Sequence, residues 1–535
     1  MGKYLKKDNC NTVTEVVERN VREIYNISLS SFMEEMEMPY LDQLKEAADF
    51  IMRYIETAPE GMIHIIGDYD CDGITATAIL VLAFRYADCD VSYRIPYRFS
   101  EGYGLNEKII DEIDDGLIIT VDNGIAAINA VKKAKEKGLK VVVTDHHIPV
   151  KDKDGNIILP EADVILDPHI NPEKSEFEDY CGAGLAYRLA REINPSMNLR
   201  DLRVLASIAT VADVMPLYGA NRTLVRHGLE DINRRICPPG LKELLKEAKF
   251  DNHITEENYG FGIGPIFNGV SRLADKGATK GVRLLIADRD DPKLPFTAKN
   301  LVDSNNKRKQ IQREQEEIAE EALTDEKPIV IYDENFGEGI IGLIAGKFCE
   351  KYNCPTIVFT KTKNPHIIKG SGRSIKEIHL KNALDSIQDK IVGFGGHAGA
   401  AGLSIEADRF MEFKKSFIEA CGEIPEYSEP KYDLELNVEN LEETMNEQNK
   451  YAPYGEGNPK LLYHIKYTPD GEYKEMGDSG IHFKLCDSRL NLLGFGLAQK
   501  YKDMGSPKTL DCIGYLSESW YNDKMTYQLQ MIDFK

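Results

Sequence analysis

Several features that mark other protein classes are missing from this chain of 535 residues. It has no basic surplus, because 66 Lys and Arg stand against 88 Asp and Glu, which gives a formal charge of −22. A histone-like binder is therefore excluded, although a locally basic groove or bound divalent cations can still hold a phosphodiester. The longest obvious apolar run, residues 78–84, is far shorter than the roughly 18–20 residues of a membrane span. We therefore expect no membrane segment.

Paired cysteines are also missing. The ten cysteines are scattered and form no Cys-x-x-Cys pair, so neither a disulfide framework nor a structural zinc site is indicated. The first six residues contain no apolar signal core. Both observations predict a reduced, cytoplasmic protein. The balance of 42% hydrophobic and 29% charged residues is typical of a folded chain, and at roughly 100–200 residues per domain the length predicts three or four domains.

The first half of the chain alternates between strand and helix patterns. Short, β-rich apolar runs occur at 62–66, 117–121, 140–144 and 163–166. The segments between them, such as 74–86 and 126–137, have the composition of packed helices. This alternation predicts an α/β fold with a parallel sheet covered on both faces. Ligands bind beyond the carboxyl ends of the strands in such sheets, so functional residues are expected there.

Three further regions follow. Residues 241–323 have a mainly helical pattern and end in a charged stretch, which we interpret as a solvated helix that joins two lobes. A second α/β pattern begins at 328, and five or so short strands after 461 predict a small OB-like β-barrel. The predicted domains are an N-terminal extension (1–45), an α/β catalytic domain (46–235), a helical region with a connector helix (236–324), a smaller α/β domain (325–425), and a linker with the OB-like domain (426–535).

Acidic and histidine residues gather where four of these elements end. They are Asp68, Asp70 and Asp72 after the first strand, Asp122 after the next, Asp145, His146 and His147 after the third, and Asp213 after the apolar segment 205–212. Singly, each has an ordinary interpretation as a turn residue, a helix cap or a hydrogen-bonded histidine. Because four elements converge on one edge of the sheet, a shared role is favoured.

The Asp-x-Asp-x-Asp-Gly run at 68–73 also matches the start of a calcium-binding loop. An EF-hand requires a bidentate Glu at its twelfth position, where this chain has Ile79, and a strand precedes the run. Carboxylates with an imidazole instead form a hard, oxygen-rich site that suits Mn²⁺ or Mg²⁺. Two such ions, roughly 3.5–4 Å apart, can activate water for phosphoryl displacement. The cluster therefore predicts a hydrolytic two-metal centre.

Four motifs resemble, in order and spacing, motifs I to IV of the DHH phosphoesterase superfamily. They are GDYDCDG (67–73), VDNG (121–124), DHH (145–147) and VADVMPL (211–217). The segments GRS (372–374) and GGHAGAAG (395–402) are similar to the DHHA1 domain of these enzymes. The resemblance implies a DHH catalytic domain with a parallel sheet and a smaller DHHA1 domain that binds substrate.

Other segments resemble the RecJ branch of that superfamily. They are LDPHINP (166–172), CGAGLAY (181–187), FGIGPIFNGVSRL (261–273) and PYGEGNP (453–459). A composition rich in Lys, Glu and Ile favours an archaeal RecJ-like nuclease. One departure concerns 265–272, which lacks the first Arg of the bacterial pattern GPRLNAAGR. A bacterial-type strand contact is therefore not expected at that point.

The resemblance implies roles for named residues. The metal ligands would be Asp68, Asp70, Asp72, Asp122, His146 and Asp213, with Asp122 as the bridge, although one of the first three could lie outside direct contact. Of the catalytic residues Asp145, His146 and His147, the first would orient the adjacent imidazole and His147 would meet a phosphate oxygen or assist the leaving group. The substrate-binding residues would be Asn123, Arg373, Ser374, Gly395, Gly396 and His397. A tight turn is the alternative interpretation of 395–402.

The implied activity is a Mn²⁺- or Mg²⁺-dependent exonuclease that degrades single-stranded DNA, or RNA, from an end, in the 5′→3′ direction, in DNA repair or replication. Two alternatives stay open: a phosphodiesterase for short oligonucleotides or cyclic dinucleotides, and a replication scaffold that binds a GINS-type complex or another replication or repair protein through the acidic region 406–449. The OB-like barrel at the end of the chain implies binding of single-stranded nucleic acid. Its candidate aromatic and basic residues are Tyr463, Tyr467, Phe483, Phe495, Tyr515, Trp520, Lys466, Lys484 and Lys524.

Overall fold

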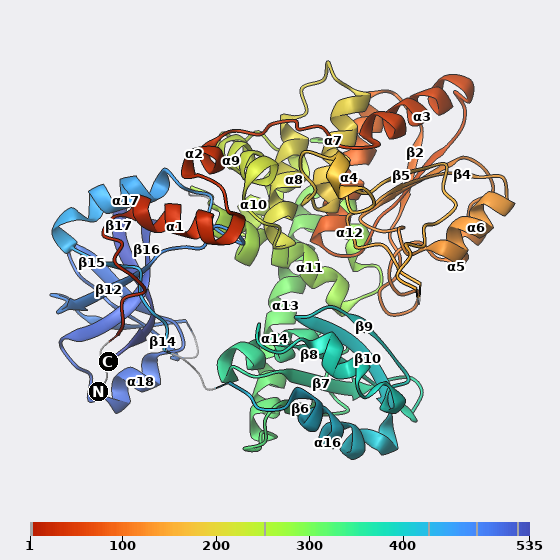
Figure 1. Ribbon diagram of the computed structural model, residues 1–535. Coiled ribbons are helices and arrows are strands. Elements are labelled where there is room, and N and C mark those ends of the chain that lie inside the picture. The colour runs from red at the N-terminus through yellow and green to blue at the C-terminus, as the bar shows by residue number, and fades with distance from the viewer. Residues whose placement is uncertain (1–3, 153, 251–252, 426–428, 478–479, 522–523) are drawn as a thin grey trace. The chain divides into compact units, whose positions relative to one another are not determined.

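The structure is a computed structural model that describes residues 4–535 except 153, 251–252, 426–428, 478–479 and 522–523. The chain divides into two compact units (Figure 1). The first contains Met1–Pro265, Ala278–Ala298 and Glu429–Lys535, and the second contains Ile266–Gly277 and Lys299–Ser428. Among the helices that the structure describes, none is long and apolar enough to cross a membrane.

The predicted parallel sheet is present in the first unit. Its strands are β1 (Ile63–Ile66), β2 (Val91–Arg94), β3 (Leu117–Val121), β4 (Lys140–Thr144) and β5 (Val164–Leu166), in the order β2-β1-β3-β4-β5, with every pair parallel. Strand β2 was not predicted from the sequence, because it is a half-buried edge strand with polar residues. The order reverses between β1 and β3, and ligands of open α/β sheets bind at such a switch point.

Helices pack around this sheet. They are α3 (Leu44–Thr57), α4 (Cys71–Tyr86), α5 (Glu107–Asp111), α6 (Ile128–Glu136), α7 (Gly182–Ile193) and α8 (Arg200–Ala212). Helix α4 is buried on all sides from Cys71 to Phe84, because it packs against the sheet, α7 and α8. Helices α5 and α6 enclose a separate apolar cluster with side chains of β1, β3 and β4. The carboxyl ends of the strands are thereby held in a rigid frame.

The C-terminal sheet, also in the first unit, has seven strands. They are β11 (Leu434–Glu435), β12 (Leu462–Tyr467), β13 (Tyr473–Met476), β14 (His482–Leu485), β15 (Leu490–Gly494), β16 (Leu510–Tyr521) and β17 (Lys524–Phe534), in the order β11-β12-β16-β17-β15-β14-β13. The sheet is mixed, since β11–β12 and β15–β17 are parallel. The predicted OB-like domain therefore has seven strands rather than five or so, and over the described residues the pairing leaves β11 and β13 as edges.

The N-terminal segment belongs to this C-terminal core. Helices α1 (Val13–Tyr25) and α2 (Leu29–Met33) bury apolar residues in the same cluster as α17 (Leu441–Asn449) and the sheet (Figure 1). The backbone of Lys6 forms an isolated parallel β-bridge with that of Tyr432, and the Tyr4 hydroxyl donates a hydrogen bond to Asp533. The short helix α18 (Ala498–Asp503) completes the domain. The predicted N-terminal extension is thus a structural part of the C-terminal domain.

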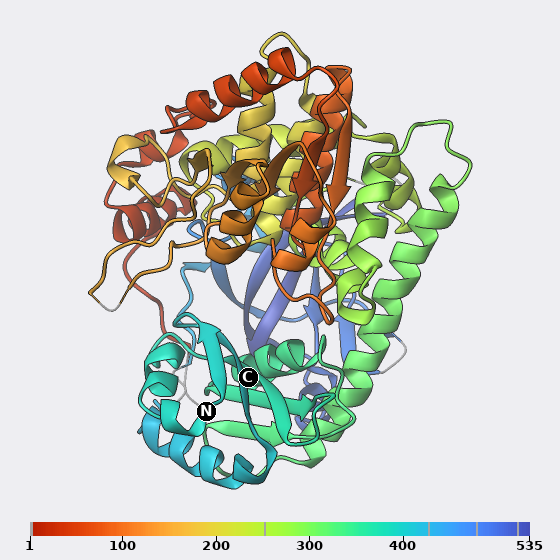
Figure 2. The ribbon, with the colours of Figure 1, turned by 90° about the vertical axis from the view of Figure 1, so that its right-hand side faces the viewer.

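The predicted helical region contains α9 (Gly219–Asn233), α10 (Pro239–Glu247), α11 (Gly264–Leu273), α12 (Gly277–Leu285) and α13 (Leu294–Glu321). Helix α13 is one continuous helix of 28 residues, which Figure 2 shows along its length. The charged stretch of the sequence lies in it, as predicted. Because α13 begins in the first unit and ends in the second, it is the connector.

The second unit is the smaller α/β domain. Its strands β6 (Ile329–Tyr332), β7 (Thr356–Lys361), β8 (Ile367–Arg373), β9 (Gly393–Gly396) and β10 (Ala400–Glu406) form a sheet in the order β6-β7-β8-β10-β9. Only β6–β7 is a parallel pair. Helices α14 (Ile341–Tyr352), α15 (Leu380–Asp385) and α16 (Phe410–Cys421) cover it with two apolar clusters.

Candidate metal centre

The first cluster of acids lies in the turn between β1 and α4. Asp70 caps the helix, since its Oδ1 accepts a hydrogen bond of 3.0 Å from the backbone N–H of Gly73. A Cβ atom at Gly73 would lie 2.5 Å from the backbone nitrogen of Asp68, so only glycine allows this turn. The sequence Asp-x-Asp-x-Asp-Gly therefore folds into a tight turn that presents carboxylates at the end of β1.

Asp72 is fixed by another helix. Its two oxygens accept hydrogen bonds from the backbone N–H groups of Gly182 (2.6 Å) and Ala183 (2.8 Å), at the start of α7. A helix N-terminus favours a carboxylate in this position. A Cβ atom at Gly182 would lie 2.5 Å from the Cβ of Asp122. The glycine in CGAGLAY thus allows α7 to approach both acids.

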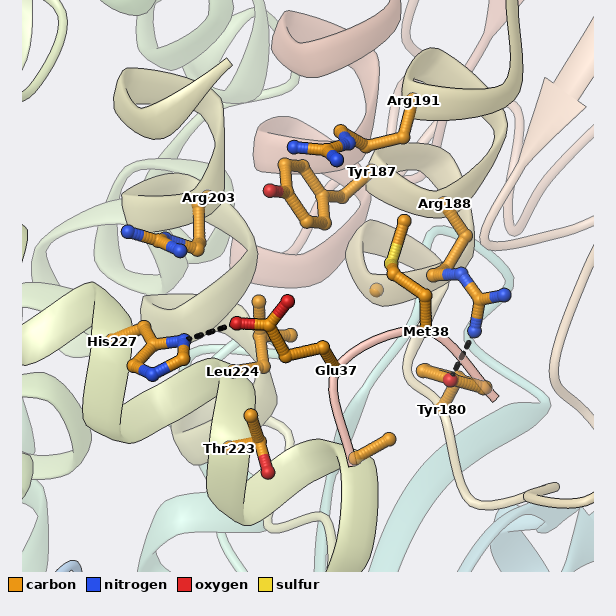
Figure 3. A pocket seen from close by; sticks show the side chains of 12 residues that line it. Glu37, Met38, Tyr180, Tyr187, Arg188, Arg191, Arg203, Thr223, Leu224 and His227 are labelled. Atoms are coloured by element: carbon orange, nitrogen blue, oxygen red, sulfur yellow. Dashed lines mark hydrogen bonds and ion pairs between the residues drawn. The ribbon is translucent and has the colours of Figure 1, made fainter. Parts of the chain in front are cut away.

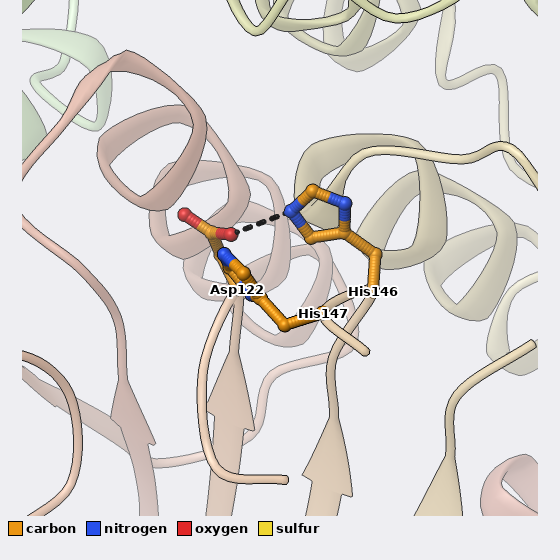
Figure 4. A group of neighbouring side chains, drawn as sticks. All are labelled: Asp122, His146 and His147. Carbon is orange, nitrogen blue, oxygen red and sulfur yellow. Dashed lines mark hydrogen bonds and ion pairs between the residues drawn. The ribbon is translucent and has the colours of Figure 1, made fainter. Parts of the chain in front are cut away.

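Asp122 follows β3 in a strained backbone conformation. Its φ angle is +61°, in the left-handed region that non-glycine residues rarely adopt. The Tyr103 hydroxyl donates a hydrogen bond of 2.8 Å to its carbonyl oxygen. Its carboxylate Oδ1 lies 3.1 Å from Nε2 of His146 (Figure 4). Strain of this kind is concentrated at functional sites.

His146 follows β4 and faces three acids. Its Nε2 lies 3.7 Å from Oδ2 of Asp72 and 3.7 Å from Oδ2 of Asp213, in addition to Asp122. Asp213 stands at the carboxyl end of α8, so a helix rather than a strand delivers it. Burial lowers the pKa of His146. The neutral imidazole, which is the form that binds a metal, is therefore favoured.

The predicted metal ligands meet in two groups of three. In one group, ligand atoms of Asp68, Asp70 and Asp122 all lie within 4.8 Å of one another, and in the other those of Asp72, His146 and Asp213 do. The contact between Asp122 and His146 joins the groups. The six residues come from four separate parts of the sequence, since Asp68, Asp70 and Asp72 share one turn and Asp122, His146 and Asp213 follow other elements. The arrangement has the donor set for two hard divalent cations that share a carboxylate.

Without a cation, these buried carboxylates repel one another. Burial, and after it the charges of the neighbouring carboxylates, raises the pKa values of Asp68, Asp122 and Asp213. Oδ1 of Asp68 is buried and has no hydrogen-bond partner among the described residues. A buried acceptor without a partner requires an explanation. Divalent cations would relieve both the repulsion and this unsatisfied oxygen, so the residues fit the metal that their pattern predicts.

Asp145 and His147 form a separate pair at the end of β4. Asp145 is buried, and its Oδ1 accepts from the backbone N–H of His147 (3.2 Å) and lies 2.7 Å from Nδ1 of the same residue. Although burial opposes it, this contact raises the pKa of His147 to about 9. His147 is half-exposed. Two adjacent histidines therefore differ: the shift of its pKa favours the neutral form of His146, whereas the contact with Asp145 favours the cationic form of His147.

Asn123 does not behave as predicted. Its side chain is fully buried, and its amide group donates to the carbonyl oxygens of Ile66 (3.0 Å) and Val121 (2.9 Å). Its Oδ1 accepts from the backbone N–H of Leu105. These contacts hold the ends of β1 and β3 together. The geometry therefore gives Asn123 a structural role and argues against the predicted substrate contact.

Residues that were not predicted from the sequence line the same edge. Tyr103 contacts Nδ1 of His147 at 3.2 Å, and the guanidinium of Arg98 lies 4.6 Å from the ring centroid of Tyr69. Their segment, 98–105, has no strand or helix periodicity that would place it. Asp167 and His169 follow β5 at this edge. The signal for this pair was present, because Asp-x-His also occurs at 145–147.

In the second unit, the predicted substrate-binding residues lie at one end of the sheet. Arg373 ends β8 opposite Ala400 of β10, and Gly396 of β9 pairs with Ala401. The backbone N–H of Ser374 donates to the carbonyl oxygen of Gly399 (2.9 Å). Gly395, Gly396 and His397 are exposed. The structure therefore brings Arg373 and the glycine-rich segment together, within this unit.

The aromatic candidates of the C-terminal domain divide into two kinds. Tyr463 and Phe483 are fully buried in its core, and Tyr467 is 8% exposed. These three candidates therefore belong to the core, which is where aromatic residues of a small barrel are more often found. Tyr515 is partly buried, whereas Phe495 and Trp520 are about half exposed. Of these candidates, Phe495 and Trp520 have the most exposed side chains.

A small cavity of about 50 Å³ lies away from the predicted residues, between α7, α8 and α9 (Figure 3). Arg188 lines it and donates to the Tyr180 hydroxyl and the carbonyl oxygen of Pro39. Glu37 lies 3.8 Å from His227, and both belong to a group with Glu35. Because Glu35 is also ion-paired with Arg226, a competing positive charge is already present. The metal chemistry belongs to the sheet edge.

Comparison with known families matches three domain models. Residues 62–212 match the N-terminal domain of the DHH family, 325–423 match the DHHA1 domain, and 432–533 match the RecJ OB domain. The parallel sheet with its acidic edge, the second α/β unit and the C-terminal sheet thus define a DHH-family protein with a DHHA1 domain and an OB domain.

Individual relatives identify the branch of the DHH family to which the chain belongs. The chain is 33% identical over 460 residues to the single-stranded-DNA-specific exonuclease RecJ of Haemophilus influenzae, covering 79% of this chain and 77% of the relative. It is 31% identical over 505 residues to RecJ of Thermus thermophilus, covering 92% and 71%. The chain belongs to the RecJ family. With RecJ of Bacillus subtilis it shares 31% identity over 511 residues, 92% of this chain but only 63% of that protein.

Solved structures agree with the fold. RecJ of Thermus thermophilus in complex with Mn²⁺ superposes with a TM-score of 0.77 at 26% identity, covering 98% of this chain and 78% of that one. A second structure, of exonuclease RecJ bound to manganese, has a TM-score of 0.61 at 30% identity and covers 72% and 96%. The arrangement of strands and helices is therefore that of RecJ proteins.

Proposed function

We propose that this protein is a metal-dependent exonuclease that hydrolyses the phosphodiester bonds of single-stranded DNA, or RNA, from an end, in the 5′→3′ direction. The observation that carries the proposal is the pair of three-residue groups joined by Asp122 and His146. The names of the RecJ relatives and the manganese in two RecJ structures support it. A role in DNA repair or replication follows from that substrate.

The proposed cofactor is a pair of Mn²⁺ or Mg²⁺ ions. When bound, the ions supply activation of a water molecule and neutralise charge on the scissile phosphate. Asp68, Asp70 and Asp122 would hold one ion, and Asp72, His146 and Asp213 the other, with Asp122 shared. The backbone N–H groups at the start of α7 keep Asp72 oriented.

His147 is the proposed proton donor. One water is consumed as the bond between phosphorus and the leaving oxygen breaks, and that oxygen requires a proton. Asp145 holds the imidazolium by its Nδ1, so the opposite nitrogen, Nε2, faces away from the carboxylate. A cationic imidazole can bind a phosphate oxygen and then protonate the leaving oxygen. Tyr103, in contact with the same ring, fixes its position.

Arg373, Ser374, Gly395, Gly396 and His397 are proposed to bind the phosphate of the substrate from the second unit. A guanidinium can contact phosphate oxygens in a bidentate manner, and exposed backbone N–H groups of a glycine-rich segment bind anions. The half-exposed Trp520 and Phe495 are proposed to stack on bases further along the strand.

The proposal is tested with Mn²⁺ and strands labelled separately at each end, in DNA and RNA versions. We expect mononucleotides to appear at once from 5′-labelled DNA and a ladder of shortening products from 3′-labelled DNA. A ladder from the 5′ label would reverse the direction. Faster turnover of a dinucleotide than of a long strand would instead favour an oligonucleotide phosphodiesterase, and no product from any substrate would end the proposal.

A replication or repair partner, such as a GINS-type complex, is a second proposal, and one observation favours it. The acids Glu439, Glu442 and Glu443 are exposed on α17 and the turn before it, and Glu447 lies on the same helix. Such a surface suits a basic partner. Co-purification of a variant with Glu442→Gln and Glu443→Gln should recover less partner than the wild type. Equal recovery would remove this surface from the proposal.

A further inference from the structure

Strands β4 and β5 end in the same short pattern. Asp145-His146-His147 follows β4, and Asp167-Pro168-His169 follows β5. The strands are parallel neighbours, with Thr144 opposite Leu166, and the backbone N–H of Asp145 donates to the carbonyl oxygen of Leu166 (3.1 Å). Because adjacent strands lie about 4.8 Å apart, the two aspartates leave the sheet side by side, at the edge that holds the metal ligands.

The two pairs share the backbone contact, but their side-chain contacts differ, because Nδ1 of His147 is hydrogen-bonded to its aspartate and Nδ1 of His169 is buried without a hydrogen-bond partner among the described residues. In the second pair, Oδ1 of Asp167 accepts from the backbone N–H of His169 (2.9 Å), and Nδ1 of His169 lies 3.4 Å from the same oxygen. The first pair has the corresponding distances of 3.2 and 2.7 Å. In each ring Nδ1 faces the aspartate of its own strand, so Nε2 faces away from it. The second imidazole thus stands beside the aspartate of its own strand, as His147 does, one strand further along the sheet.

The burial of the Asp167 carboxylate is energetically unfavourable, and packing alone does not explain it. It is 4% exposed, and its Oδ2 is buried without a hydrogen-bond partner among the described residues. A buried carboxylate with an unsatisfied oxygen is stabilised when its neighbour carries a positive charge. His169, whose side chain is 27% exposed, is that neighbour, and Asp167 raises its pKa.

We propose that His169 is a substrate-binding residue whose Nε2–H donates to an oxygen of the phosphate next to the scissile one, with Asp167 as its positioning residue. The inference rests on the proposed function, since the ligand is a nucleic acid strand that spans the metal centre. His147 serves the phosphate being cleaved, and His169 serves its neighbour. A substrate with one phosphodiester therefore does not use His169.

The test compares His169→Gln with the wild type on two substrates in Mn²⁺: a 5′-phosphorylated twelve-nucleotide thymidine strand, and bis(p-nitrophenyl) phosphate, which has one phosphodiester. The Kd of the fluorescent strand in EDTA is measured by anisotropy. We expect the KM and Kd of the strand to rise about ten- to a hundredfold, as for one lost hydrogen bond to a charged group, with kcat within twofold of the wild type. Turnover of the small diester should not change.

Two further variants separate positioning from folding. Asp167→Asn should raise the strand KM in the same direction, and the double variant should be no worse than His169→Gln, because the two residues act as one unit. His366→Gln, on an exposed loop of the second unit, is the matched control and should behave as the wild type. Melting temperatures show whether each variant is folded.

The outcomes are distinct. Equal losses of activity on both substrates would show a structural role and overturn the inference. A strand KM and Kd within twofold of the wild type would also overturn it. If the wild type cleaves neither substrate, the proposed function fails, and the Kd in EDTA still decides whether His169 contacts the strand.

Discussion

The edge of the first sheet and the end of the second unit's sheet are built in opposite ways. At the first edge, buried acids are held by backbone donors before any ligand arrives, as Asp72 is by Gly182 and Ala183. At the second, the glycine-rich segment 395–397 is exposed. The first site is specified by the fold and stressed by its own charge, whereas the second has open donors and little strain.

The two sites should therefore have different roles: the carboxylate site serves the chemical step, and the glycine-rich site serves substrate binding. A site of crowded carboxylates gains most from cations, so a substitution there should change metal binding, stability and turnover together. A site of exposed donors meets only the substrate, so a substitution there should change substrate affinity alone. Each substitution below is chosen to test that division.

Asp122→Asn should have the largest effect. The amide cannot serve as the shared anionic ligand, so we expect kcat in Mn²⁺ to fall by about a thousandfold or more. The metal-free protein should become more stable, because burial and the charges of Asp72, Asp70 and Asp68 raise the pKa of Asp122. A raised carboxyl pKa means that the folded state binds the proton more tightly, so stability falls as pH rises above about 4.

Melting in EDTA at pH 5.5 and pH 8 checks this prediction. The wild type should lose stability between the two pH values, and Asp122→Asn should lose less and melt at a higher temperature at pH 8. Asp303→Asn, on α13 of the second unit, serves as the control. A variant that melts lower than the wild type in EDTA would contradict the idea that the acids repel one another.

His147→Gln should lower kcat by about a hundredfold, as expected when a proton donor is lost. Asp145 raises the pKa of His147 to about 9 although burial opposes it. The imidazolium is therefore present at neutral pH and is lost as pH rises through that value, and bound cations shift the loss to lower pH. The wild-type profile of kcat against pH should fall on its alkaline side, and the variant should lack this fall. An unchanged alkaline limb would assign it to another group.

Arg373→Gln should raise the KM of a strand about thirtyfold and leave Mn²⁺ affinity unchanged, because none of the predicted metal ligands lies in its unit. Arg373→Lys keeps the charge but loses the bidentate geometry, so its KM should lie between those of the wild type and Arg373→Gln. Titration of Mn²⁺ by calorimetry, beside steady-state kinetics, measures both quantities. A loss of Mn²⁺ affinity in Arg373→Gln would remove the division between the sites.

Much of the first edge could be predicted from the sequence, because strand ends are local signals. Asp68, Asp122 and His146 follow short apolar runs, and the geometry of a parallel sheet brings such ends together. Tyr103 could not be found in this way, since it lies in a loop whose path depends on contacts with Asp122 and His147. The role of Asn123 was misjudged because sequence position does not show that its amide is already bonded to β1 and β3.

The C-terminal domain was harder to predict for a different reason. Its short edge strands β11 and β13 have no strong periodicity, and its core includes α1 from the other end of the chain. An aromatic residue in a strand points to either face, and a shift of one residue exchanges core and surface. Phe483 and Trp520 are alike in sequence terms, yet the first is buried and the second is exposed.

Those two aromatics give the prediction with the smallest effect on strand binding. Trp520→Ala should weaken the binding of a long strand about fivefold, the value of one stacking contact of about 1 kcal/mol, without changing the melting temperature. Phe483→Ala should lower the melting temperature instead, because removal of a buried phenyl ring costs about 3–5 kcal/mol. Anisotropy with a long strand and thermal melting measure the two variants in parallel. If Trp520→Ala destabilises the domain as much as Phe483→Ala does, then its ring belongs to the packing of the sheet, and the binding surface of this domain must be sought among other side chains.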